Sequence, residues 1–169
     1  IEEQAKHRGL HDREAAEGIA ARVFADADAI VGVSSGVGNY LADCGVPPHK
    51  VHVIPNGVTV DRFDPAPRPR DNALVVGFVG TLKPWHGVDT LVEAVRIVRE
   101  RGVPAQLLII GDGPERAALE AQLHETELAN VTELTGAVSP NDIAPLIARM
   151  DVATAPYPDL QDFYFSPLK

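Results

Sequence analysis

The sequence has almost no cysteine, since Cys44 is the single one among 169 residues. A lone cysteine excludes an intrachain disulfide and any metal site built from several thiolates. The sequence also lacks an apolar run close to the ~20 residues that span a bilayer, and it has no signal-peptide pattern. Low cysteine content favours a reducing compartment, and we expect a cytoplasmic protein.

Positive charge is scarce as well. The formal net charge is −9, and the acidic residues are spread along the chain rather than gathered in blocks. A nucleic-acid-binding protein needs a basic footprint, so we expect no nucleic-acid partner. The hydrophobic fraction of 45% is large enough for a folded core. Because the chain starts at Ile1 and stops at Lys169 without a turn or cap, we expect a fragment of a longer protein.

Two motifs of nucleotide and metal chemistry are missing. No G-x-G-x-x-G follows an apolar segment, and Gly36-Val37-Gly38 lacks the third glycine of a dinucleotide-binding dehydrogenase. A Rossmann dehydrogenase is therefore the weakest of the functions that we consider. The sequence also shows no pair of aspartates arranged to bind a metal, and we expect no metal site.

What the sequence does contain is a strand, a turn and a helix in succession. Residues 74–79 are apolar and mostly β-branched or aromatic, as in a strand buried on both faces of a parallel sheet. Gly80 ends the strand, and apolar residues from residue 91 on have the spacing of a helix packed on a core. Such a unit places a helix N-terminus at the carboxyl edge of the sheet, where it attracts anions, phosphate above all. Because the turn also carries Lys83 and His86, we expect it to hold the diphosphate of a nucleotide donor.

The same alternation of strands and helices runs along the chain. Apolar segments predict further strands at 29–33, 51–54, 106–110, 131–134 and 151–155. Helices are predicted between them, one capped by Ser34 or Ser35, one with Pro114 at its first position and one opened by a capping box at Ser139. The pattern predicts an α/β fold with a doubly wound parallel sheet.

Two further features concern the layout of this fold. Ligands of doubly wound sheets bind outside the carboxyl ends of the strands, and we expect the turns at Gly80, Gly111 and Gly136 to fall there together. Three prolines within residues 65–69 forbid a helix interior or a strand ladder. We therefore place a domain boundary in this segment.

Six segments of the chain resemble a known family in order and spacing. They are ADAIVGVSSGVGNYL, VHVIPNGVTVDRFDP, VGFVGTLKPWHGVDTLVEAV, LLIIGDGPER, LTGAVSPNDIAPLIARMDVATAPY and FYFSPLK. Together they resemble the middle of a family 4 glycosyltransferase, one of the retaining group 1 enzymes with the GT-B fold of two facing Rossmann-like domains. The resemblance implies that residues 1–63 end the acceptor-side domain, that 64–72 link the domains, and that 73–169 begin the nucleotide-sugar domain. Both domains would be only partly present.

The resemblance also implies which residues contact the donor diphosphate. The family usually clamps it with an arginine and a lysine, at the positions of Thr81 and His86 in this chain. Lys83 is then the substitute cation, beside Gly80, and Lys169 is a second candidate. The alternatives are a solvated loop lysine for Lys83, an ordinary exposed terminus for Lys169 and a surface histidine for His86. Trp85 would either stack on the nucleotide or pack the turn against its domain.

A second family signature lines up with FYFSPLK. Its first glutamate falls on Tyr164, a departure from the pattern, and its second glutamate would fall three positions beyond Lys169. The backbone of Phe165, Ser166 and Leu168 would still offer N–H groups to the donor sugar or phosphate. Gly111 and Val138 would lie beside the base. No residue of the chain is assigned a catalytic role.

The function implied by the resemblance is transfer of a sugar from a UDP-, GDP- or ADP-sugar to an acceptor hydroxyl with retention of configuration. The reaction would need no metal and no further cofactor. The acceptor would be a sugar, a lipid-linked sugar or a polysaccharide, and contact with the inner membrane face would come from regions outside this chain. The alternative is a catalytically silent nucleotide-binding or scaffold domain, favoured by the departures at Thr81, His86 and Tyr164. We expect the isolated fragment to be inactive.

Overall fold

The computed structural model describes residues 11–63 and 73–157. These residues form two compact units, one that ends at Gly57 and one that starts at Val58. Each unit has its own sheet, two-stranded in the first and four-stranded in the second, and all strand pairs are parallel. The proline-rich segment expected to separate two domains lies in 64–72, outside the described residues.

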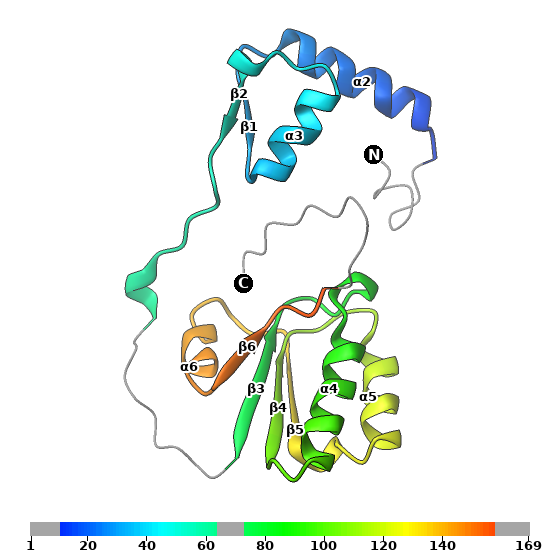
Figure 1. Ribbon diagram of the computed structural model, residues 1–169, viewed down its shortest axis with the longest axis vertical. Helices are drawn as coiled ribbons and strands as arrows, with labels where there is room; N and C mark the ends of the chain where they lie inside the picture. The colour runs from blue at the N-terminus through cyan, green and yellow to red at the C-terminus, as the bar shows by residue number, and fades with distance from the viewer. Residues whose placement is uncertain (1–10, 64–72, 158–169) are drawn as a thin grey trace. The chain divides into compact units, whose positions relative to one another are not determined.

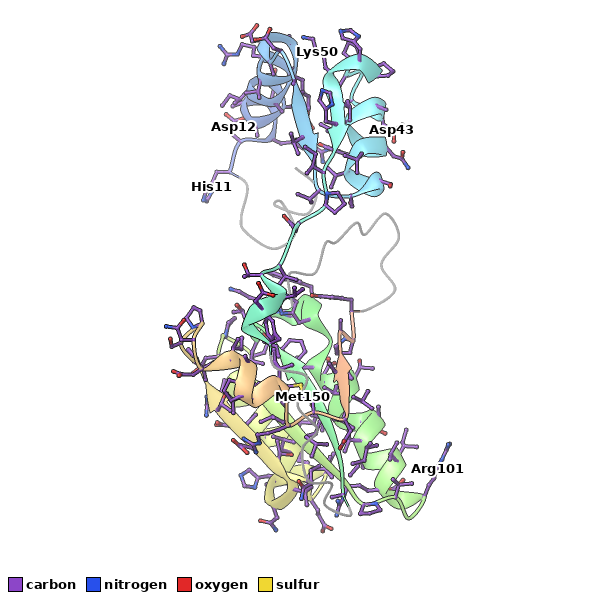
Figure 2. The ribbon with its side chains drawn as sticks, turned by 90° about the vertical axis from the view of Figure 1, so that its left-hand side faces the viewer. His11, Asp12, Asp43, Lys50, Arg101 and Met150 are labelled. Atoms are coloured by element: carbon purple, nitrogen blue, oxygen red, sulfur yellow. The ribbon has the colours of Figure 1, made fainter. Side chains whose placement is uncertain are left out.

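The first unit contains two helices and a parallel strand pair. Its elements are α2 (Arg13–Asp26), β1 (Ile30–Gly32), α3 (Ser35–Asp43) and β2 (Val51–Val53). The expected serine cap is Ser34, whose Oγ accepts from the Val37 N–H at 3.2 Å. At the other end of the unit, Lys50 (labelled in Figure 2) donates from Nζ to the Ala25 carbonyl near the end of α2, at 3.0 Å.

The strands of the first unit are less buried than their apolar sequences predicted. Val31 is 56% exposed and Val53 is 46% exposed. The physical reason is that the sheet has only two strands in the described residues, so it offers little surface for the strand side chains to pack against. The prediction of buried strands at 29–33 and 51–54 was therefore wrong in this structure, although both strands are present.

The second unit is the predicted doubly wound sheet. Its strands are β3 (Leu74–Val79), β4 (Ala105–Ile110), β5 (Thr132–Gly136) and β6 (Val152–Thr154), in the order β5-β4-β3-β6. The helices are α4 (Val88–Glu100), α5 (Arg116–Glu125) and α6 (Ile143–Ile147). Figure 1 shows α4 and α5 on one face of the sheet and α6 on the other. The α/β fold class is confirmed.

The core of this unit lies between the sheet and the α4–α5 layer. Phe78 of β3 and Ile109 of β4 are fully buried, and so is Val92 of α4. On the opposite face Met150 (labelled in Figure 2) lies directly against Gly77 of β3, where a side chain larger than hydrogen would overlap it. The apolar run of residues 74–79 is thus explained by burial on both faces of its strand.

Two predicted helix starts were wrong. Pro114 is not the first residue of α5, which begins at Arg116, because residues 114 and 115 form a turn in which the Glu115 N–H donates to the Leu82 carbonyl at 3.2 Å. Ser139 does not open a capping box. Its Oγ accepts from Asn141 at 3.3 Å and its carbonyl accepts from the Asp142 N–H at 2.9 Å, so it forms a separate turn before α6.

Candidate functional site

The turn between β3 and α4 is built from two glycines and a short helix. Gly80 ends β3 with φ 149°, a 3₁₀ helix spans Pro84–His86, and Gly87 precedes α4 with φ 62°. Positive φ values suit glycine because it has no Cβ. Gly87 is the N-cap of α4, and as a glycine it makes no side-chain capping hydrogen bond to this helix end. The N–H groups of the first turn of α4 therefore lack the side-chain acceptor that most helices supply.

The turn is fastened to the neighbouring turn, which follows β4. The Gly80 N–H donates to the Ile110 carbonyl at 2.9 Å, and the Leu82 N–H donates to the Asp112 carbonyl at 3.0 Å. The two backbones approach so closely that a Cβ at Gly111 would overlap the Gly80 carbonyl. A Cβ at Gly113 would lie 2.7 Å from the Leu82 nitrogen. The glycines after β4 thus have a packing role in holding the β3–α4 turn.

Lys83 and Trp85 contact each other inside the turn. The Lys83 Nζ lies 5.8 Å from the centroid of the Trp85 ring, within the range of a cation–π interaction. Lys83 is half-buried rather than fully solvated. The centroid of the Trp85 ring also lies 6.1 Å from that of the His86 ring, so Trp85 packs within the turn, while its stacking on a nucleotide stays a prediction.

His86 is buried, with an exposed fraction of 7%. Its Nδ1 makes a short hydrogen bond to the Thr81 carbonyl. The centroid of its ring lies 5.9 Å from that of Phe78 in β3 and 5.5 Å from that of Tyr157, which follows β6. Burial also raises the pKa of the Tyr157 hydroxyl above its usual range. Because His86 itself is buried, the alternative of a surface histidine is wrong.

The three turns at the carboxyl edge lie together, as expected. Gly111 contacts Gly80, as described, and forms a bridge with Gly136. Arg116 lies at the same edge, where it pairs with Asp112 at 3.2 Å and with Glu120 at 2.8 Å. Val138 follows Gly136 and is half-buried.

A groove of about 300 Å³ lies beside the turn, between the first halves of α4 and α5. Its lining residues are Leu82, Lys83, Pro84, Val88, Asp89, Glu115, Ala118, Leu119 and Gln122. Lys83 is the one residue of the predicted diphosphate site among them. Because the carboxylates of Asp89 and Glu115 would repel a diphosphate, we do not place the donor in this groove.

Several predicted contacts lie outside the described residues: Tyr164, Phe165, Ser166, Leu168 and Lys169. Across residues 11–63 and 73–157, no three histidine, cysteine, aspartate or glutamate side chains gather in a group that could hold a metal ion. None of the helices in those two ranges is long and apolar enough to cross a membrane.

Sequence reasoning missed two residues that shape the turn. Tyr157 contacts His86 from a distant part of the chain, and no local pattern signals this contact. Gly113 was not among the residues singled out from the sequence. The Gly-x-Gly spacing of residues 111–113 directly after a buried strand was the available signal, since it is typical of close backbone approach.

The chain matches the models of two known protein families. The family model described as "Glycosyl transferases group 1" matches residues 73–163, and that described as "Glycosyltransferase Family 4" matches residues 5–62. The 2-deoxystreptamine glucosyltransferase of Streptomyces kanamyceticus is 29% identical over 126 residues, which cover 68% of this chain and 33% of that protein. A GDP-mannose-dependent phosphatidylinositol monomannoside mannosyltransferase of Mycobacterium tuberculosis is 29% identical over 150 residues, 83% of this chain and 39% of that protein.

Solved structures agree on the fold. HepE from Anabaena, in complex with UDP and glucose, superposes with a TM-score of 0.69 at 21% identity, over 85% of this chain and 42% of that one. Sucrose-phosphate synthase from Thermosynechococcus elongatus gives a TM-score of 0.72 at 21% identity, over 89% and 40%. Both have the GT-B fold. The chain spans roughly a third of the length of the curated relatives. Since a family model matches more than half of its residues, the chain belongs to the group 1 glycosyltransferases.

Proposed function

We propose that the protein containing this chain transfers a sugar from a nucleoside-diphosphate sugar to an acceptor hydroxyl, with retention of configuration and without a metal ion. The observation that carries the proposal is the β3–α4 turn, in which Lys83 lies next to a helix start whose N-cap residue, Gly87, offers no side-chain acceptor. Backbone N–H groups and a lysine are suited to a diphosphate, because both offer positive charge to its oxygens.

The chemistry requires stabilisation of the leaving group. When the bond to the anomeric carbon breaks, negative charge grows on the departing diphosphate. Donors that are already in place act on that charge without rearranging, so they lower the barrier to reaction as well as binding the donor. The hydrogen bonds that fasten the turn to Asp112 and Ile110 keep these donors in place.

The relatives support the choice of donor and acceptor. The names of two relatives describe a glucosyltransferase and a GDP-mannose-dependent mannosyltransferase that acts on a phosphatidylinositol mannoside, and HepE was solved with UDP. We propose a UDP-, GDP- or ADP-sugar donor and a sugar, lipid-linked or polysaccharide acceptor. We also propose that the protein is cytoplasmic, and that regions outside this chain contact the membrane when the acceptor is lipid-linked.

The same proposal assigns parts of the chain to the two domains and to the parts of the donor. Residues 1–63 would belong to the acceptor-side domain and 73–169 to the nucleotide-sugar domain, with 64–72 as their linker. Gly80, Thr81, Lys83 and His86 would serve the diphosphate. Gly111 and Val138 would serve the base, while Tyr164, Phe165, Ser166, Leu168 and Lys169 would serve the donor sugar and phosphate.

The test is removal of the Lys83 charge in the full-length protein. Lys83→Met keeps the aliphatic stem over Trp85 and removes the ammonium group. A charge-assisted contact to phosphate contributes about 1.5–3 kcal/mol, so the affinity for UDP or GDP should fall roughly ten- to a hundredfold in calorimetric titrations. Turnover of the matching nucleotide sugar should fall as well, because the lysine acts on charge that grows in the transition state.

Arg101→Met is the matched control. Arg101 (labelled in Figure 2) lies at the opposite end of α4, about 20 Å from the helix start, where salt screens its charge from the turn. Nucleotide affinity should not change. Equal affinity of Lys83→Met and the parent would remove Lys83 from the site, and a parent that binds a nucleotide but transfers no sugar to any acceptor class would favour the silent scaffold.

A further inference from the structure

His86 is packed inside the β3–α4 turn rather than exposed where its ring could reach a ligand. Its ring is enclosed by aromatic side chains from three parts of the chain: Phe78 in β3, Trp85 in the turn and Tyr157 after β6. The ring centroids lie 5.9, 6.1 and 5.5 Å away, respectively. With 7% of the residue exposed, the ring is held in one orientation by packing.

The bond from His86 fixes one peptide unit of the turn. The Thr81 carbonyl accepts from His86 Nδ1, while the N–H of the same peptide unit, which belongs to Leu82, donates to the Asp112 carbonyl at 3.0 Å. A carbonyl only accepts, so the hydrogen in this bond sits on Nδ1. Because a peptide unit is planar and rigid, two bonds at its opposite ends fix the direction in which it points.

The neighbouring peptide unit joins Gly80 to Thr81 and shares the Thr81 Cα with the first. Its carbonyl, on Gly80, faces Gly111 at close range. Carbonyl and N–H point in opposite directions in a trans peptide, so the Thr81 N–H points away from Gly111. Over the described ranges 11–63 and 73–157, this N–H donates no hydrogen bond. It is thus a donor that the fold orients and does not use.

We propose that His86 is a positioning residue of the diphosphate site, which acts through the Thr81 carbonyl. The Nδ1–H of His86 holds the Thr81–Leu82 peptide, so that the Thr81 N–H and the uncapped start of α4 face the diphosphate together. This inference rests on the proposed function. In this inference the imidazole acts indirectly, through Nδ1 and the Thr81 carbonyl. A direct bond to phosphate would instead use Nε2.

Two substitutions separate these roles. The side-chain N–H of asparagine lies as many bonds from Cβ as Nδ1 of histidine, and that of glutamine reaches toward the position of Nε2. In the full-length protein, His86→Asn should bind UDP or GDP within about threefold of the parent, and His86→Gln should bind it roughly tenfold more weakly, because the Thr81 carbonyl loses its donor. Thermal melts show whether each variant is folded.

Each other result overturns the inference. If His86→Gln binds well and His86→Asn does not, the imidazole contacts phosphate directly through Nε2. If both variants bind as the parent does, the bond to Thr81 has no role in binding. If both fail while they remain folded, the ring acts through its packing rather than through Nδ1.

A measurement on the parent protein needs no variant and no nucleotide. The ¹⁵N shifts of the His86 ring should show the tautomer with hydrogen on Nδ1, and the opposite tautomer would overturn the inference. Nucleotide binding by the parent and by His86→Asn, taken together, also separates this inference from the proposed function. A parent that binds no nucleoside diphosphate refutes both, whereas a parent that binds one, together with a His86→Asn variant that does not, refutes only the role of His86.

Discussion

Gly113→Ala tests whether the two turns at the carboxyl edge depend on their close backbone contact. The added Cβ would lie 2.7 Å from the Leu82 nitrogen and 2.9 Å from the Leu82 carbonyl carbon. These are backbone atoms, so no rotation of a side chain relieves the overlap. The backbone of Gly113 is not in the left-handed region that favours glycine, which leaves the overlap as the main cost.

The magnitude follows from what has to move. Separating the two turns would strain or break the bonds from Leu82 to Asp112 and from Glu115 to Leu82, which measure 3.0 and 3.2 Å. Overpacking costs about 1–3 kcal/mol, and each lost hydrogen bond costs about 0.5–1.5 kcal/mol. We expect Gly113→Ala to lower the free energy of unfolding by roughly 3 kcal/mol or more, with weaker nucleotide binding because Lys83 moves with the turn.

Gly77→Ala is the comparison that makes this test sharp. Its Cβ would overlap the Met150 side chain, which is flexible and can turn away. The expected loss is about 1–2 kcal/mol, and Met150→Ala should relieve part of it in a double-mutant cycle. Urea unfolding of the full-length variants measures all of these. If Gly113→Ala is no more destabilised than Gly77→Ala, then the backbone contact is not the constraint that we describe.

Two other predictions concern stability. Glu127 adopts φ 57° just after α5, where the Leu128 N–H donates to the Leu123 carbonyl at 2.9 Å. Glu127→Gly should therefore raise the free energy of unfolding by about 0.5–1 kcal/mol, whereas Ala121→Gly, at an exposed position inside the helix, should lower it by about 0.5–1 kcal/mol. Equal effects in thermal melts would refute this. Burial raises the pKa of the Tyr157 hydroxyl. The stability that the protonated hydroxyl contributes is therefore complete below the pKa of the unfolded state, about 10, and is lost as pH rises through the pKa of the folded state. Tyr157→Phe should reduce the loss of stability at alkaline pH, and an unchanged pH profile of stability would contradict the argument.

The sequence predicted best those elements whose patterns are local. The apolar run of residues 74–79 coincides with β3, because burial on both faces of a strand leaves a continuous apolar sequence, and the helical spacing after it falls within α4. The serine cap of α3 is equally local. The starts of α5 and α6 were missed because two sets of hydrogen bonds override the local preferences of Pro114 and Ser139. One is the bond from the Glu115 N–H to the Leu82 carbonyl, and the other lies within the turn at Ser139.

The candidate site was predictable in place and not in detail. Parallel strands bring their carboxyl ends to one edge, so the meeting of Gly80, Gly111 and Gly136 followed from the pattern of strands. The environment of His86 did not follow, because it depends on Tyr157 from the far end of the second unit. Packing between distant segments decides which side chains of a turn face inward, and sequence spacing does not contain that information.

The turn departs from the common family pattern at Thr81 and His86, and the burial of position 86 connects the two departures. The resemblance places a lysine where the chain has His86 and an arginine where it has Thr81. A lysine ammonium among the aromatic rings around position 86 would lose most of its hydration, at a high cost in free energy. An imidazole fits there and satisfies the Thr81 carbonyl, and the positive charge is then supplied by Lys83, over Trp85. Under the proposed function, Thr81, Lys83 and His86 would together form an alternative anion-binding turn, and the scaffold interpretation keeps Tyr164 as its main support.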